Sequence, residues 1–80
     1  MTKVRLLYFA SLREATGQAM EVVDSAAPDL AALYAETAAR HALDWPRDRL
    51  RVAVDGAFAQ WDECLRDGSE VAFIPPVSGG

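Results

Sequence analysis

The sequence predicts an α+β fold in which a mixed sheet of about five strands packs against one main helix. Three observations predict it. Short runs of branched and aromatic residues near both ends alternate in polarity, which is typical of strands. One Ala-rich segment in the middle of the chain has helical periodicity. The length of 80 residues allows one hydrophobic core and no second large domain.

The first two strands are expected at residues 3–9 and at about residues 18–24, paired as a hairpin. In the first strand, Val4, Leu6 and Tyr8 share one face. Between the strands, the spacing of Ser11 and Glu14 is that of a capping box. We therefore expect a single helical turn there, which residue 17, a glycine, ends in a left-handed conformation.

The main helix is expected to run from Pro28 and Asp29 to about Ala42. Proline is tolerated at the first helical position, and a carboxylate there interacts favourably with the helix dipole. The apolar stripe that follows has helical spacing and consists of Leu30, Leu33, Tyr34, Thr37, Ala38 and His41. Pro46 then stops the helix, because a residue before proline is disfavoured in the helical region.

Three further strands are expected at residues 50–54, 57–61 and 70–74. Asp55-Gly56 is typical of a two-residue hairpin turn, and Asp67-Gly68 forms another turn. The most apolar strands, the first and the last, are the best candidates for a parallel central pair. This order fits the β-grasp (ubiquitin-like) arrangement, with a domain over residues 1–74 and an extended, flexible Gly-Gly tail over residues 75–80.

Composition excludes several function classes. Twelve acidic against eight basic residues give a net charge of −4, which argues against a nucleic-acid partner. The longest apolar run, residues 6–10, is too short to span a bilayer, and no secretory signal opens the chain, so we expect no membrane association and a cytoplasmic location. One Cys and one His cannot complete a zinc or iron–sulfur site, so no metal is expected.

The chain ends in Gly79-Gly80, and no turn explains these two glycines. At average glycine frequency, two terminal glycines occur by chance about once in 200 chains. Two residues without Cβ can enter a channel too narrow for other side chains and place the terminal carboxyl in the active site of another protein. Activation of that carboxyl with ATP would make it an electrophile that sulfur or an amine can attack.

Two segments resemble the ubiquitin-like sulfur carriers that form the small subunit of molybdopterin synthase. Residues 67–80, DGSEVAFIPPVSGG, resemble the family ending D-G-x-E-V-A-F-x-P-P-V-[ST]-G-G. Residues 9–14, FASLRE, resemble the family start F-A-x-x-R-E. The resemblance covers the whole domain, and the C-terminal match is the more specific of the two.

The resemblance implies a cycle of reactions at Gly80 that belongs to molybdenum cofactor biosynthesis. A ubiquitin-activating-like adenylyltransferase would use ATP to adenylate Gly80, and a sulfurtransferase would supply the sulfur of a C-terminal thiocarboxylate. That sulfur would pass to a cyclic pyranopterin precursor in the large subunit of the synthase, in a heterotetramer. The tail that enters the large subunit would be Pro75, Pro76, Val77, Ser78, Gly79 and Gly80. The chain would bind no permanent cofactor and would act as a sulfur donor without independent catalytic activity.

The resemblance also implies that Phe9, Phe58 and Ile74 form an exposed apolar patch that contacts the large subunit. The alternative is that all three side chains belong to the core, as is usual for single Phe and Ile residues. Neither Cys64 nor His41 has neighbours in the sequence that predict a role for it.

Other functions remain open at this point. A sulfur carrier for thiazole or transfer-RNA thiolation would share the fold and the Gly-Gly ending, although the Pro75-Pro76-Val77 segment favours the molybdopterin family. A ubiquitin-like protein modifier would join Gly80 to a lysine amine of a target. A plain β-grasp binding module would not depend on Gly79 and Gly80 at all.

Overall fold

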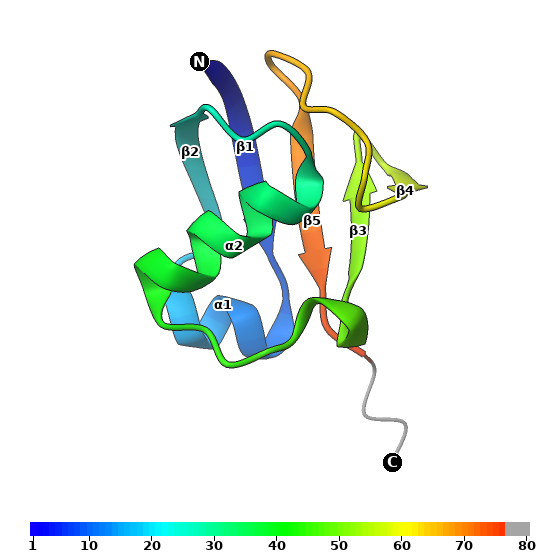
Figure 1. Ribbon diagram of the computed structural model, residues 1–80. Coiled ribbons are helices and arrows are strands. Elements are labelled where there is room, and N and C mark those ends of the chain that lie inside the picture. The colour runs from blue at the N-terminus through cyan, green and yellow to red at the C-terminus, as the bar shows by residue number, and fades with distance from the viewer. Residues whose placement is uncertain (77–80) are drawn as a thin grey trace.

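The computed structural model describes residues 1–76 as a five-stranded mixed sheet with one long helix across one face (Figure 1). The elements are β1 (Thr2–Tyr8), α1 (Ala10–Thr16), β2 (Met20–Ser25), α2 (Leu30–His41), the 3₁₀ turn η1 (Arg47–Arg49), β3 (Arg51–Val54), β4 (Ala57–Ala59) and β5 (Glu70–Ile74). The strand order is β2-β1-β5-β3-β4. The β1–β5 pair is parallel and the other pairs are antiparallel, which confirms the predicted β-grasp arrangement.

The core lies between the sheet and α2. The side chains that fill it alternate along the central strands and repeat with helical spacing on α2, as the sequence predicted: Val4, Leu6, Tyr8, Val71 and Phe73 from the sheet, and Leu30, Leu33 and Tyr34 from the helix. Phe73 is fully buried, with the Tyr34 ring edge-on at 5.1 Å and the Trp61 ring stacked at 6.1 Å between centroids. This aromatic cluster fixes the end of β5 from which the tail departs.

The long helix α2 begins two residues later than the sequence predicted, at Leu30 and not at Pro28. Asp29 is its N-cap residue, and Asp29 Oδ1 accepts a 2.8 Å hydrogen bond from the backbone N–H of Ala32. Pro28 therefore precedes the cap and does not occupy the first helical position. The C-cap is Ala42 in the left-handed region, which confirms the predicted end of the helix.

The short helix α1 differs from its prediction. It spans seven residues from Ala10, and its N-cap residue Phe9 makes no side-chain capping bond, so the capping box of Ser11 and Glu14 is wrong. The helix begins before Ser11, which leaves the Ser11 side chain inside the first turn, where it cannot serve as the N-cap. The Phe9 carbonyl accepts the N–H of Leu12 at 3.0 Å, and burial of Leu12 fixes the helix against the sheet. Gly17, with φ of 76°, ends the helix as predicted.

The β3–β4 hairpin has the expected two-residue turn, with positive φ at Asp55 and Gly56. The second strand is shorter than predicted, because β4 ends at Ala59 and not at residue 61. Trp61 instead turns inward to stack on Phe73. No helix within residues 1–76 is long and apolar enough to cross a membrane.

Candidate functional site

The site predicted from the sequence begins where the chain leaves β5, at the end of the sheet near α1 and η1 (Figure 1). Pro75 is buried and Pro76 is exposed. These two prolines line an apolar cavity of about 660 Å³. The other residues that line it are Phe9, Ala10, Ser11, Trp45 and Ile74. We call Pro75 and Pro76 the tail stem. The remaining predicted tail residues, Val77, Ser78, Gly79 and Gly80, lie outside the described residues.

The base of the tail stem is held by the aromatic cluster. The Tyr34 hydroxyl on α2 donates a 2.6 Å hydrogen bond to the Trp45 carbonyl, and the Tyr34 ring packs against Phe73 on β5. Trp45 lines the cavity around the stem and packs against the core. The stem therefore departs from a packed base that connects α2, the loop after it and β5.

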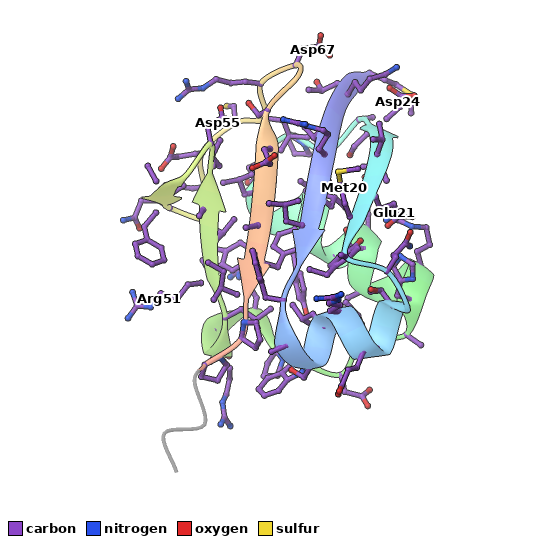
Figure 2. The ribbon with its side chains drawn as sticks, turned by 180° about the vertical axis from the view of Figure 1, so that it is seen from behind. Met20, Glu21, Asp24, Arg51, Asp55 and Asp67 are labelled. Atoms are coloured by element: carbon purple, nitrogen blue, oxygen red, sulfur yellow. The ribbon has the colours of Figure 1, made fainter. Side chains whose placement is uncertain are left out.

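The face of the sheet opposite α2 is not covered by a helix in the described structure, and Figure 2 shows it from that side. Strand register places one apolar residue from every strand in a line across this face. The line, which we call the apolar row, is Met20, Leu7, Ala72, Ala53 and Phe58 in strand order. A continuous apolar line over five strands is unusual on an exposed face, where polar residues normally alternate with buried ones.

The predicted interface residues lie on or beside the apolar row. Phe58 is 73% exposed and Phe9 is 46% exposed, while Ile74 is half-buried. All three line an apolar groove of about 240 Å³ together with Leu7 and Ala72. Because Phe9 and Ile74 also line the cavity around the tail stem, the apolar surface is continuous with the stem. The alternative that all three residues belong to the core is wrong; their role as a partner interface stays a prediction.

The apolar row is bounded by charged residues on the side away from the tail stem. Arg5 and Glu70 are neighbours on β1 and β5 and form an ion pair at 3.1 Å. The Asp55 carboxylate accepts a 2.9 Å hydrogen bond from the backbone N–H of Glu70. The Arg5 and Glu70 side chains pair with each other, so charged groups border the apolar row on β1 and β5.

One polar cluster was missed by the sequence analysis. Glu21 Oε1 on β2 accepts hydrogen bonds from the Tyr8 hydroxyl at 2.7 Å and from Arg40 at 3.0 Å, and it lies 3.0 Å from His41 Nε2. Partial burial would raise the pKa of Glu21, but hydrogen bonds from His41, Tyr8 and Arg40 outweigh it and lower that pKa to about 2. Burial, followed by the hydrogen bond to Glu21, raises the pKa of Tyr8. No local pattern could reveal this cluster, because His41 follows Glu21 by 20 residues.

The Glu21 cluster joins the C-terminal turn of α2 to the edge of the sheet at β2. None of its residues lines the tail stem cavity. Cys64 is an exposed free thiol. Within residues 1–76, no group of His, Cys, Asp and Glu side chains could hold a metal ion. The described residues provide a packed base for the tail stem beside an exposed apolar surface.

The chain is similar to known proteins over nearly its full length. The model of the ThiS family matches residues 6–80. The molybdopterin synthase sulfur carrier subunit of Escherichia coli K12 is 39% identical over 80 residues, which cover 96% of this chain and 99% of that protein.

Two solved structures show the same fold over nearly the full length. A putative molybdopterin converting factor, subunit 1, from Pyrococcus furiosus superposes with a TM-score of 0.80 at 30% identity and covers 96% of this chain and 100% of its own. SAMP1 from Haloferax volcanii superposes with a TM-score of 0.79 at 27% identity and covers 98% of this chain and 99% of its own.

Proposed function

The chain belongs to the ThiS family, and we propose from this membership that it is the sulfur carrier and small subunit of a molybdopterin synthase. The observation that carries the proposal is the full-length similarity to a molybdopterin synthase sulfur carrier subunit together with the Gly79-Gly80 ending. The rigid base of the tail stem and the adjoining apolar surface support the proposal.

The proposed chemistry takes place at the carboxyl group of Gly80. A carboxylate is a poor acyl donor, so it must first be activated. In the adenylyltransferase, the Gly80 carboxylate attacks ATP, pyrophosphate leaves and an acyl adenylate forms. Hydrosulfide made available by a sulfurtransferase then attacks the carbonyl carbon, the bond from that carbon to the AMP oxygen breaks and AMP leaves. Loss of the proton on sulfur gives the Gly80 thiocarboxylate. ATP is thus a substrate of the activating partner and not a cofactor of this chain.

The large subunit supplies the active site for sulfur transfer in this proposal. Its channel would receive Val77 to Gly80, and its surface would cover Phe9, Phe58 and Ile74 beside the tail stem. Apolar side chains that are exposed in the free protein and adjoin a reactive segment are typical of the core of a protein interface. There the thiocarboxylate sulfur would bond to a carbon of a cyclic pyranopterin precursor, and water would cleave the acyl–sulfur bond and regenerate the Gly80 carboxylate. Two such transfers would complete the dithiolene of molybdopterin.

A second candidate function is that of a ubiquitin-like protein modifier. The likeness to SAMP1, the small archaeal modifier protein 1, favours it. The same activated Gly80 carbonyl would be attacked by a lysine amine of a target protein, and an isopeptide bond would form. The two functions share the activation step and differ in the nucleophile that follows.

Reconstitution tests the proposal. The chain is incubated with the large subunit and adenylyltransferase of its own organism, ATP, a sulfur donor and the precursor, and molybdopterin is measured. We expect conversion by the wild-type chain and none by a variant that lacks Gly79 and Gly80. Conversion by the truncated variant would contradict the proposal, and transfer of the chain to protein lysines without conversion would favour the modifier function.

A further inference from the structure

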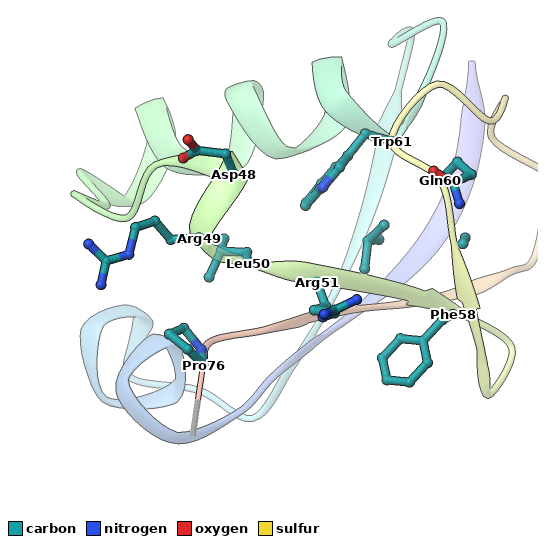
Figure 3. A pocket seen from close by; sticks show the side chains of 10 residues that line it. Asp48, Arg49, Leu50, Arg51, Phe58, Gln60, Trp61 and Pro76 are labelled. Carbon is teal, nitrogen blue, oxygen red and sulfur yellow. The ribbon is translucent and has the colours of Figure 1, made fainter. Parts of the chain in front are cut away.

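A second groove, with a volume of about 470 Å³, lies at the edge of β3 beside the tail stem (Figure 3). The β3–β4 ladder stops at the pair of Val52 and Ala59, so β4 does not cover the first residue of β3. The groove lies beside this uncovered edge. Figure 3 shows Trp61 on one side of β3 and Phe58 on the other, with Pro76 near the end of the groove.

Arginines are concentrated along this groove. Arg47, Arg49 and Arg51, which we call the arginine cluster, are three of the eight basic residues of the chain. All three are exposed, and Arg49 and Arg51 line the groove directly. The same segment contains one carboxylate, that of Asp48. A chain with a net charge of −4 thus carries a local excess of positive charge next to its tail stem.

Among the described residues, no carboxylate forms an ion pair with the arginine cluster. Arg5 and Arg40, in contrast, each pair with a glutamate. The backbone of the cluster is fixed all the same, because Leu50 between Arg49 and Arg51 is buried in the core. The guanidinium of Arg47 lies 5.9 Å from the centroid of the Trp61 ring, within the range of a cation–π contact. The backbone that carries the cluster is therefore fixed, and its exposed guanidinium groups are open to a partner.

We propose that the arginine cluster binds an acidic segment of the large subunit when that subunit receives the tail. Pro76 lines the groove together with Arg49 and Arg51, so a protein that binds the tail stem lies next to the cluster. Phe58 lines both this groove and the apolar groove, which makes the two surfaces continuous. The proposal rests on the proposed function, because it requires a partner that receives the tail.

The chemistry of the cluster favours carboxylates of a protein as its ligands. A guanidinium presents a planar fork of donors that matches a carboxylate, and several such pairs at the rim of an interface orient the partner and accelerate association. A nucleic acid needs a longer basic surface without interruption, and Asp48 interrupts this one.

Association kinetics with the purified large subunit of the same organism test the proposal. The variant is Arg49→Glu/Arg51→Glu. We expect its association rate constant to fall by about tenfold at low ionic strength, and the difference from wild type to shrink at high salt as the charges are screened. The neutral variant Arg49→Gln/Arg51→Gln should show a smaller decrease in the association rate constant. It replaces the charge-reversal variant in the test if the charge reversal disturbs folding.

The matched control is Lys3→Glu/Arg66→Glu, which changes the net charge by the same amount. Lys3 and Arg66 are exposed, and their carbonyls accept hydrogen bonds from Gly68 and Ser69 just before β5, at the end of that strand opposite the tail stem. The association rate constant of the control should stay within about twofold of the wild-type value. Wild-type association of both cluster variants at low salt, or an equal loss in the control, would overturn the proposal. Thiocarboxylate formation at Gly80 is measured separately in each variant, so that failure of the carrier function is distinguished from failure of the docking proposal.

Discussion

Tyr8 and Glu21 are joined side chain to side chain across neighbouring strands, with the Tyr8 hydroxyl donating a 2.7 Å hydrogen bond to Glu21 Oε1. Arg40 and His41, in the last turn of α2, converge on the same carboxylate oxygen. These interactions at Glu21 connect the inner face of β1 with the edge strand β2 and with α2. They predict that Glu21 contributes to stability and that this contribution depends on pH.

The change Glu21→Gln tests this contribution. Gln cannot be charged, so the charge-assisted hydrogen bonds from Tyr8 and Arg40 weaken, and we expect the free energy of unfolding to fall by about 1 kcal/mol at pH 7. Because the pKa of Glu21 is about 2 in the folded state and 4.5 ordinarily, the contribution is complete above about pH 4.5 and is lost as the pH falls toward 2. Urea unfolding at pH 7 and pH 3 measures it.

The control for that experiment is Glu14→Gln, at an exposed position of α1. We expect the control to unfold like the wild type at pH 7. A Glu21→Gln variant that keeps full stability at pH 7, or that loses as much free energy of unfolding at pH 3 as at pH 7, would contradict the role of the Glu21 charge.

The hydrogen bond from Tyr34 to the Trp45 carbonyl predicts a second stability effect. Tyr34→Phe keeps the ring against Phe73 but leaves the Trp45 carbonyl without this donor, so we expect a loss of about 1 kcal/mol in the free energy of unfolding. Urea unfolding followed by tryptophan fluorescence measures the loss. An unchanged midpoint and slope would show that the loop at Trp45 does not depend on this hydrogen bond.

The exposed apolar surface predicts a separation of binding from stability. Phe58 is 73% exposed, so Phe58→Ala should change the free energy of unfolding by less than about 0.5 kcal/mol. Because Phe58 is an exposed aromatic side chain that lines both grooves of the proposed interface, its loss should weaken binding of the large subunit by at least about tenfold. Calorimetric titration with the purified large subunit measures the affinity.

Val22→Ala is the matched control for Phe58→Ala. Val22 is 53% exposed on β2, and it is paired with Arg5 and not with a member of the apolar row. We expect its affinity for the large subunit to stay within about twofold of wild type. Equal losses in both variants would mean that general surface hydrophobicity, and not the apolar row, determines binding.

Much of the fold could be predicted because local patterns agreed with the tertiary structure. The alternation of Val4, Leu6 and Tyr8 identified the inner face of β1, and Asp55-Gly56 identified the hairpin turn. The apolar character of β1 and β5 identified the parallel central pair. These features depend on periodicity and on backbone angles, which a sequence records directly.

Other features depended on contacts between distant residues. Trp61 leaves the line of β4 because its ring stacks on Phe73. Helix α1 starts early because burial of Leu12 overrides the capping preference of Ser11. The apolar row exists only once strand register is known, since its five members come from five separate strands. The Glu21 cluster could not be predicted for the same reason, because its members are far apart in the sequence. The terminal glycines could be predicted as a site because their position at the end of the sequence is itself informative.

The central claim is that Gly80 is the sulfur-carrying group, and the mass of the C-terminal peptide tests it most directly. The protein is incubated with ATP, the adenylyltransferase of its own organism and a sulfur donor, and the peptide is then analysed. The account predicts that one oxygen of the Gly80 carboxylate is replaced by sulfur. An unmodified Gly80 carboxylate, in the presence of an adenylyltransferase of demonstrated activity, would contradict it.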